Sequence, residues 1–213
     1  MNTTSAFGTE RTALLCIVRR NISKQQEIGI KSENSLGFIS ANLFRTTQPS
    51  GYLDSTTCVY GIYSKQRNQG LEVNSSGKVS DNMKLIGGIS WIESKQRKPQ
   101  NVKNEGHRAI GIPTYPGNVG FDYELPLARN IAINGRFIFK VNQYFNNENT
   151  QQIVLWKRTD IVACYSTHPH IILRSSVKKV FNSNYWCSAT SGRIAGISRS
   201  ELKTYVISCI FNF

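Results

Sequence analysis

Residues 136–156, RFIFKVNQYFNNENTQQIVLW, are the stretch of this chain that decides its fold class. Phe137, Phe139 and Val141 occupy every second position, as side chains on one face of a strand do. The run NNENT at positions 146–150 has the composition of a turn, and a second apolar run, IVLW, follows at positions 153–156. The stretch therefore predicts an antiparallel β-hairpin.

The rest of the chain repeats this pattern of short apolar segments bounded by Gly, Asn, Ser or Pro. Twelve segments rich in Ile, Val, Phe, Tyr and Trp are predicted to be strands: Thr12–Arg19, Leu36–Phe44, Thr57–Tyr63, Lys84–Ile92, Ala109–Thr114, Gly120–Leu125, Arg136–Phe145, Gln151–Arg158, Ile161–Tyr165, His170–Arg174, Tyr185–Ala189 and Thr204–Phe213. Helix signals are few. Leu125–Ile133 has room for two turns, and Ser198–Glu201 has the spacing of a capping box ahead of Leu202–Val206, although that segment also suits a strand.

Many strands with turn residues between them favour a sandwich or a barrel over alternating strands and helices. We expect an all-β fold with one or two short helices, in a single domain over residues 1–213. An antiparallel β-sandwich of the jelly-roll or Greek-key type is the predicted architecture. The long polar stretches Thr46–Ser55, Ser64–Asn82 and Glu93–His107 are predicted to be loops, where function concentrates.

Charge points to an anionic partner. The chain has 26 Lys and Arg against 13 Asp and Glu, a formal net charge of +13 and a pI near 9.7. A field of this sign attracts nucleic acid, an anionic membrane or an acidic protein. The cations are dispersed through the strands instead of being gathered in one basic arm.

A short repeat marks some of these cations. Ser64-Lys65-Gln66-Arg67 recurs as SKQR at positions 94–97, and SKQQ at positions 23–26 is a looser copy. Cations at strand exits can reach phosphates, although polar residues end strands in many soluble proteins. The predicted nucleic-acid-binding residues are Arg19, Arg20, Lys65, Arg67, Lys95, Arg97, Lys98, Lys178 and Lys179.

Candidates for catalysis are few. The pair His168 and His170 has the spacing of a metal site, and Asp122 and Glu124 share one strand face, but no third ligand stands near either pair. Common nucleophile and phosphate-binding motifs are missing. We predict that the chain is not an enzyme and uses no cofactor or metal.

The first residues lack the charged start and apolar run of a secretory signal, and the longest apolar stretch, residues 13–18, is too short for a membrane helix. Five cysteines without CxxC spacing indicate buried free thiols in a reducing compartment. The aromatic terminal strand 204–213 is a feature that outer-membrane barrels share, but the missing signal and the cysteines argue against one. No membrane contact is predicted.

These observations favour a structural protein that assembles with copies of itself and contacts RNA or DNA. A small viral capsid subunit, located in the virion or the host cytoplasm, is the most concrete version. An RNA-binding component of a larger ribonucleoprotein is the alternative. A metal-dependent enzyme that uses His168, His170 and Asp122 or Glu124 is a third possibility.

Overall fold

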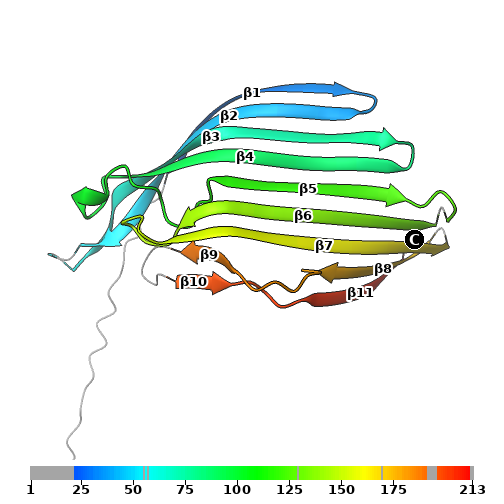
Figure 1. Ribbon diagram of the computed structural model, residues 1–213. Coiled ribbons are helices and arrows are strands. Elements are labelled where there is room, and N and C mark those ends of the chain that lie inside the picture. Colours follow the sequence, from blue (N-terminus) through cyan, green and yellow to red (C-terminus); the bar gives the residue numbers. More distant parts are fainter. Residues whose placement is uncertain are drawn as a thin grey trace, which may run out of the picture.

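The fold is seen in a computed structural model that describes residues 22–54, 56, 58–128, 130–168, 170–190 and 196–211. Nearly all of this part of the chain is strand (Figure 1). The elements are β1 (Lys24–Asn34), β2 (Gly37–Leu53), β3 (Tyr60–Ser80), β4 (Met83–Arg97), the 3-10 turn η1 (Val102–Asn104), β5 (Tyr115–Glu124), β6 (Ile131–Tyr144), β7 (Gln152–His168), β8 (Ile171–Lys178), β9 (Trp186–Thr190), β10 (Gly196–Arg199) and β11 (Thr204–Phe211). None of the described residues forms a helix long and apolar enough to cross a membrane.

One large antiparallel sheet dominates the molecule. Its nine strands lie in the order β1-β2-β3-β4-β5-β6-β7-β8-β11, and β9 and β10 form a separate two-stranded sheet. The predicted hairpin is confirmed: β6 and β7 pair with Val141 opposite Leu155. The all-β, antiparallel class is confirmed as well, with almost no helix.

The two ends of the sheet differ in their connections. At the short-turn end, residues 35–36, 81–82, 125–130 and 169–170 join successive strands. At the loop end, the connections are residues 54–59, 98–114, 145–151 and 179–203. The loop end lies at the left of Figure 1.

Strands are longer than the sequence pattern predicted. Ser64–Asn82 and Thr46–Ser55 were predicted to be loops, yet most of these residues belong to β3 and β2. The strand β1, with the polar sequence KQQEIGIKSEN, was missed. Polar residues occupy these strands because one face of the sheet is polar, so polarity there does not mark a loop.

Other local predictions also need correction. Ala109–Thr114 is not a strand, and Leu125–Ile133 forms a turn and then enters β6 instead of a helix. The segment after the capping-box spacing is the strand β11, the alternative considered for it. The predicted strand Thr12–Arg19 lies outside the described residues. The single domain over residues 1–213 stays a prediction.

The predicted jelly-roll or Greek-key sandwich is wrong. A sandwich buries the inner faces of two sheets against each other about 10 Å apart. Here the nine-stranded sheet keeps large apolar side chains exposed across one face, including Leu43, Val119 and Leu173. The same alternation of apolar and polar residues serves both architectures, so the pattern alone did not separate them.

The small buried core lies at the loop end. Ile153 and Trp156 of β7 pack with Ala189 of β9, and Phe145 and Tyr185 lie against this cluster. The Trp156 indole stacks on Tyr185, with 4.9 Å between ring centroids, and its Nε1 donates to the Cys187 carbonyl at 3.1 Å. This cluster attaches the β9–β10 hairpin to β7.

Candidate functional site

The register of the sheet sorts side chains onto two faces of opposite character. Leu85 of β4 lies opposite Phe121 of β5. Phe121 lies opposite Gly135 of β6, which in turn lies opposite Ile161 of β7, so these four residues form one row across the sheet. One residue further along β4, Lys84 lies opposite Asp122 on the other face. Because side chains alternate along a strand, each apolar row is followed by a polar row on the opposite face.

The apolar face is open to the surroundings over most of the sheet. Val119 is 49% exposed, Ile89 49% and Ile28 73%. Aromatic rings lie over glycines on the neighbouring strand: a Cβ on Gly135 would come 2.3 Å from the Phe121 ring. The face is therefore smooth and apolar, and the described residues supply no second layer to cover it.

The polar face carries amide side chains and charged side chains of both signs. Asn134 donates to Asp122 at 2.6 Å, and Arg158 pairs with Asp160 at 3.0 Å. A hollow on the sheet is lined by apolar residues, among them Ile86 and Val162, and by the polar residues Asn118, Asp122, Asn134, Arg136, Asp160, Arg174, Ser176 and Lys178. A sheet with one exposed apolar face and one exposed polar face suits a wall between lipid and water.

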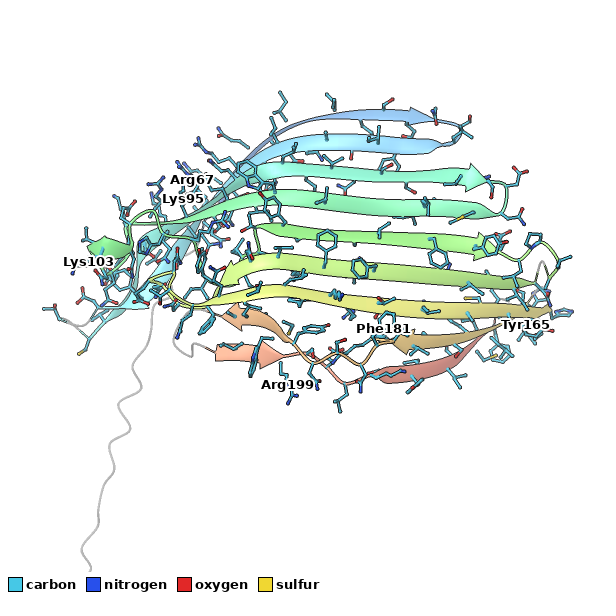
Figure 2. The ribbon with its side chains drawn as sticks, in the orientation of Figure 1. Arg67, Lys95, Lys103, Tyr165, Phe181 and Arg199 are labelled. Atoms are coloured by element: carbon cyan, nitrogen blue, oxygen red, sulfur yellow. The ribbon has the colours of Figure 1, made fainter. Side chains whose placement is uncertain are left out.

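The three copies of the SKQ repeat meet at the loop end of the sheet. Lys24 of β1 lies opposite Thr47, Thr47 lies opposite Arg67, and Arg67 lies opposite Lys95. Lys65 lies opposite Arg97 in the next row of the same face. Figure 2 shows Arg67 and Lys95 beside each other, with Lys103 of η1 farther toward the left end of the molecule. The antiparallel register thus turns a repeat in sequence into one cationic surface.

Few carboxylates balance this surface. Glu93 pairs with Lys95 at 2.7 Å and accepts from Gln69 at 2.8 Å, and Glu105 pairs with Arg97 at 3.2 Å. Within the described residues, Lys65 and Arg67 form no ion pair with a carboxylate.

The remaining predicted cations lie elsewhere. Lys98 follows β4 and its backbone N–H donates to Glu105 at 2.7 Å. Lys178 ends β8, and Lys179 is buried, with its Nζ donating to Ser200 at 2.8 Å. Arg19 and Arg20 fall outside the described residues. Four of the nine predicted residues therefore lie on the cationic surface, namely Lys65, Arg67, Lys95 and Arg97, whereas Lys98 follows the end of β4, and Lys178 and Lys179 lie apart from it.

Sequence reasoning missed two members of the cationic surface, Lys24 and Arg45. Arg45 lies opposite Gln69, and its Nε donates to the Gln69 amide oxygen at 3.4 Å. The loose SKQQ copy was the available signal for Lys24. No local pattern marked Arg45, because only the pairing of β2 with β3 places it there.

The proposed metal ligands do not come together. The rings of His168 and His170 lie 5.4 Å apart at the short-turn end, whereas Asp122 and Glu124 stand on β5, two strands away from β7. The described part of the chain holds no group of three His, Cys, Asp or Glu side chains arranged for a metal.

Comparison with known proteins agrees with a sheet that has one apolar and one polar face. Residues 22–174 match a family described as TonB dependent receptor-like, beta-barrel. The ferrichrome receptor FcuA of Yersinia enterocolitica is 32% identical over 167 residues, which cover 77% of this chain and 22% of that receptor. The chain thus spans about a fifth of the length of this relative.

Solved structures share the fold. The ferric preacinetobactin receptor BauA of Acinetobacter baumannii superposes with a TM-score of 0.76 at 24% identity, over 90% of this chain and 29% of that one. The ferripyoverdine receptor of the outer membrane of Pseudomonas aeruginosa gives a TM-score of 0.67 at 15% identity, over 91% and 27%.

These matches overturn the predicted function. The predictions of a capsid subunit and of a ribonucleoprotein component are both wrong. The predictions of self-assembly with RNA or DNA, of no membrane contact, and of a location in the virion or host cytoplasm are wrong as well. The prediction of buried cysteines is wrong for Cys209, which is exposed in the same row as Leu173. At the family level the matched proteins are receptors and not enzymes.

Proposed function

Because this chain belongs to the TonB-dependent receptor-like β-barrel family, we propose that it forms part of the barrel wall of an outer-membrane receptor that takes up ferric siderophores. The observation that carries the proposal is the register, which places apolar side chains on one exposed face and polar side chains on the other. The apolar face contacts lipid, and the polar face lines the inside of the barrel.

The connections support the orientation of this wall. Barrels of the outer membrane have short periplasmic turns and longer extracellular loops. The connections of residues 35–36, 81–82 and 169–170 suit the periplasmic side, and those of residues 98–114 and 179–203 suit the outside. A siderophore arriving from outside meets the loop end first.

The substrate class is inferred from a relative that is 32% identical over 167 residues and is named as a ferrichrome receptor. The polar face offers amide and charged groups of both signs, such as Asn118, Asp122 and Arg136, and these can hydrogen-bond a polar iron chelate. We assign ferric siderophores as the cargo, with ferrichrome as the first compound to test.

Uptake of radioactive iron tests the proposal. The protein is expressed in the outer membrane of a strain that lacks its own ferrichrome receptor but retains its energy-coupling proteins. Uptake from ferrichrome above the empty-vector strain is expected. A folded, membrane-inserted protein that imports iron from neither ferrichrome nor ferripyoverdine would contradict the proposed function.

A further inference from the structure

The β9–β10 hairpin lies against the polar face of the sheet at the loop end, where Figure 1 shows β9 next to β7. Ile138 lies opposite Asn118, in a row of the polar face. Trp156 lies opposite Lys140, two positions further along β6 and so on the same face. Ile138 and Trp156 both pack in the cluster that contains Ala189 of β9. The polar face is the inner face of the proposed barrel, so the hairpin lies inside the wall, at the end from which cargo arrives.

Lys179 fastens the base of the connection that carries this hairpin. Its backbone N–H donates to the Asp160 carboxylate of β7 at 2.9 Å. Its Nζ, on a buried side chain, donates to Ser200 Oγ at 2.8 Å and to the Glu201 carbonyl at 2.5 Å. Lys179 begins the connection and residues 200–201 lie near its end, so one side chain joins the two places where the chain leaves the sheet and returns to it.

The middle of β9 is held by two hydrogen bonds to one carbonyl group. The Cys187 carbonyl accepts from Trp156 Nε1 at 3.1 Å and from Gln143 Nε2 at 3.3 Å. Gln143 is only 2% exposed, so water competes little for its hydrogen bond. These contacts fix the hairpin to β6 as well as to β7.

The far end of β9 meets the connection of residues 98–114 at Gly111. This glycine has φ +75°, and a Cβ there would lie 2.1 Å from the Ala189 carbonyl oxygen. Only glycine permits both the backbone conformation and the close approach. The Gly111 N–H donates to the Tyr144 carbonyl at 2.8 Å, so the same residue is tied to β6 and contacts β9.

The connection of residues 98–114 is itself fixed. The Arg108 N–H donates to Asn149 Oδ1 at 2.6 Å, and Asn149 Nδ2 donates back to the Arg108 carbonyl at 3.1 Å. The Gln96 N–H of β4 donates to the His107 carbonyl at 2.7 Å. The connections of residues 98–114, 145–151 and 179–203 therefore form one packed, hydrogen-bonded unit at the loop end.

We propose that Gly111 is a positioning residue for cargo binding. By admitting the β9 backbone, it holds the hairpin on the polar face as a preformed side of the cargo site, so cargo binds without first ordering the hairpin. A site that is ordered before binding keeps the affinity that ordering would otherwise cost. The inference rests on the proposed function, since it takes the polar face as the inner face and ferric siderophores as the cargo.

Binding of radioactive ferrichrome to intact cells on ice, where uptake stops, tests the role of Gly111. Gly111→Ala is expected to raise the dissociation constant of ferrichrome at least about tenfold, because cargo must then order residues of the hairpin. The uptake rate at saturating ferrichrome should stay within about twofold of wild type. A lower saturating rate with an unchanged dissociation constant would place Gly111 in transport instead of cargo binding, against the proposal.

Gly106→Ala is the matched control. Gly106 lies in the same connection and has φ +80°, but a Cβ there meets no heavy atom within 4 Å. The two variants therefore carry the same kind of backbone strain, and only Gly111→Ala displaces the β9 backbone. Gly106→Ala is expected to leave the dissociation constant within about twofold. Equal dissociation constants in the two variants would overturn the proposal.

Hydrogen exchange of the purified wild-type protein supplies a test that needs no variant, and it decides the matter if Gly111→Ala does not reach the membrane. The amides of β9 and β10 are expected to be protected before ferrichrome is added, and to gain no more than about twofold in protection on its addition. Protection that appears only with ferrichrome would identify a lid that closes on cargo and would contradict a preformed site.

The outcomes also separate the two proposals. If the wild-type protein imports ferrichrome iron but its hairpin is unprotected, or if the two alanine variants bind ferrichrome equally, only the role of Gly111 fails. If the wild-type protein imports iron from neither ferrichrome nor ferripyoverdine, the proposed function fails, whatever the exchange of the hairpin shows.

Discussion

In the proposed barrel wall, single residues decide whether a strand position contacts lipid or water, and neighbours on β5 show this most clearly. Val119 stands on the apolar face between Gly87 and Phe137, and Asn118 stands on the polar face between Gly88 and Ile138. The two positions are one residue apart, so they share depth in the membrane but not environment.

Val119→Arg is expected to destabilise the folded protein in bilayers by about 2–4 kcal/mol, because a charge near the bilayer midplane loses its hydration. The control Asn118→Arg places the same charge on the polar face and should change stability much less. Urea unfolding in lipid vesicles measures both variants. Equal destabilisation by the two substitutions would argue against a lipid-facing Val119.

A glycine under an aromatic ring is a second feature at this scale. Gly135 of β6 lies opposite Phe121 of β5, and a Cβ there would come 2.3 Å from the ring. Gly135→Ala is expected to cost about 1–3 kcal/mol because the ring must move. A double-mutant cycle with Phe121→Ala should recover part of that loss, and strictly additive effects would show that the two side chains do not interact.

At the scale of elements, the attachment of the β9–β10 hairpin depends on Trp156 and Tyr185. The rings stack with an interplanar angle of 5°, and Lys179 Nζ lies 5.3 Å from the Tyr185 ring centroid. Burial raises the pKa of the Tyr185 phenol. The phenol therefore stays neutral in the docked hairpin at a pH where it ionises in the undocked one.

Docking is accordingly expected to weaken as the pH rises above about 10, the ordinary pKa of tyrosine. In that range the undocked form binds fewer protons, so increasing pH favours it. Near-ultraviolet circular dichroism of the stacked pair follows the change. Tyr185→Phe should keep the hairpin docked across the same range, and a wild-type signal that does not fall in alkali would refute this account.

The sequence predicted the presence of most strands better than it predicted their lengths. The hairpin of β6 and β7 was predictable because aromatic and β-branched residues alternate there around an Asn-rich turn. By contrast, β3 contains Asn74, Ser75 and Ser76 in its second half, and these residues are typical of loops in a soluble protein. Asn74 and Ser76 lie on the polar face of the sheet, where such residues are tolerated, so composition alone predicted a loop where β3 continues.

At the scale of the whole molecule, the sequence showed alternation but not what the apolar side contacts. A sandwich core and a lipid-facing wall both require apolar residues at every second position. The decisive fact is the register across strands from β1 to β8, which keeps every apolar row on one uncovered face. The SKQ copies were recognised as a repeat, but only this register brings them together on one surface.

In the proposed receptor, this sheet separates lipid from water. The most direct test places a nitroxide label at each position from 117 to 123 of β5, one at a time, in the membrane-inserted protein. Collision with oxygen, which concentrates in lipid, should be high at the odd positions, and collision with a water-soluble nickel chelate should be high at the even positions. Accessibility that does not alternate with a period of two would contradict the account.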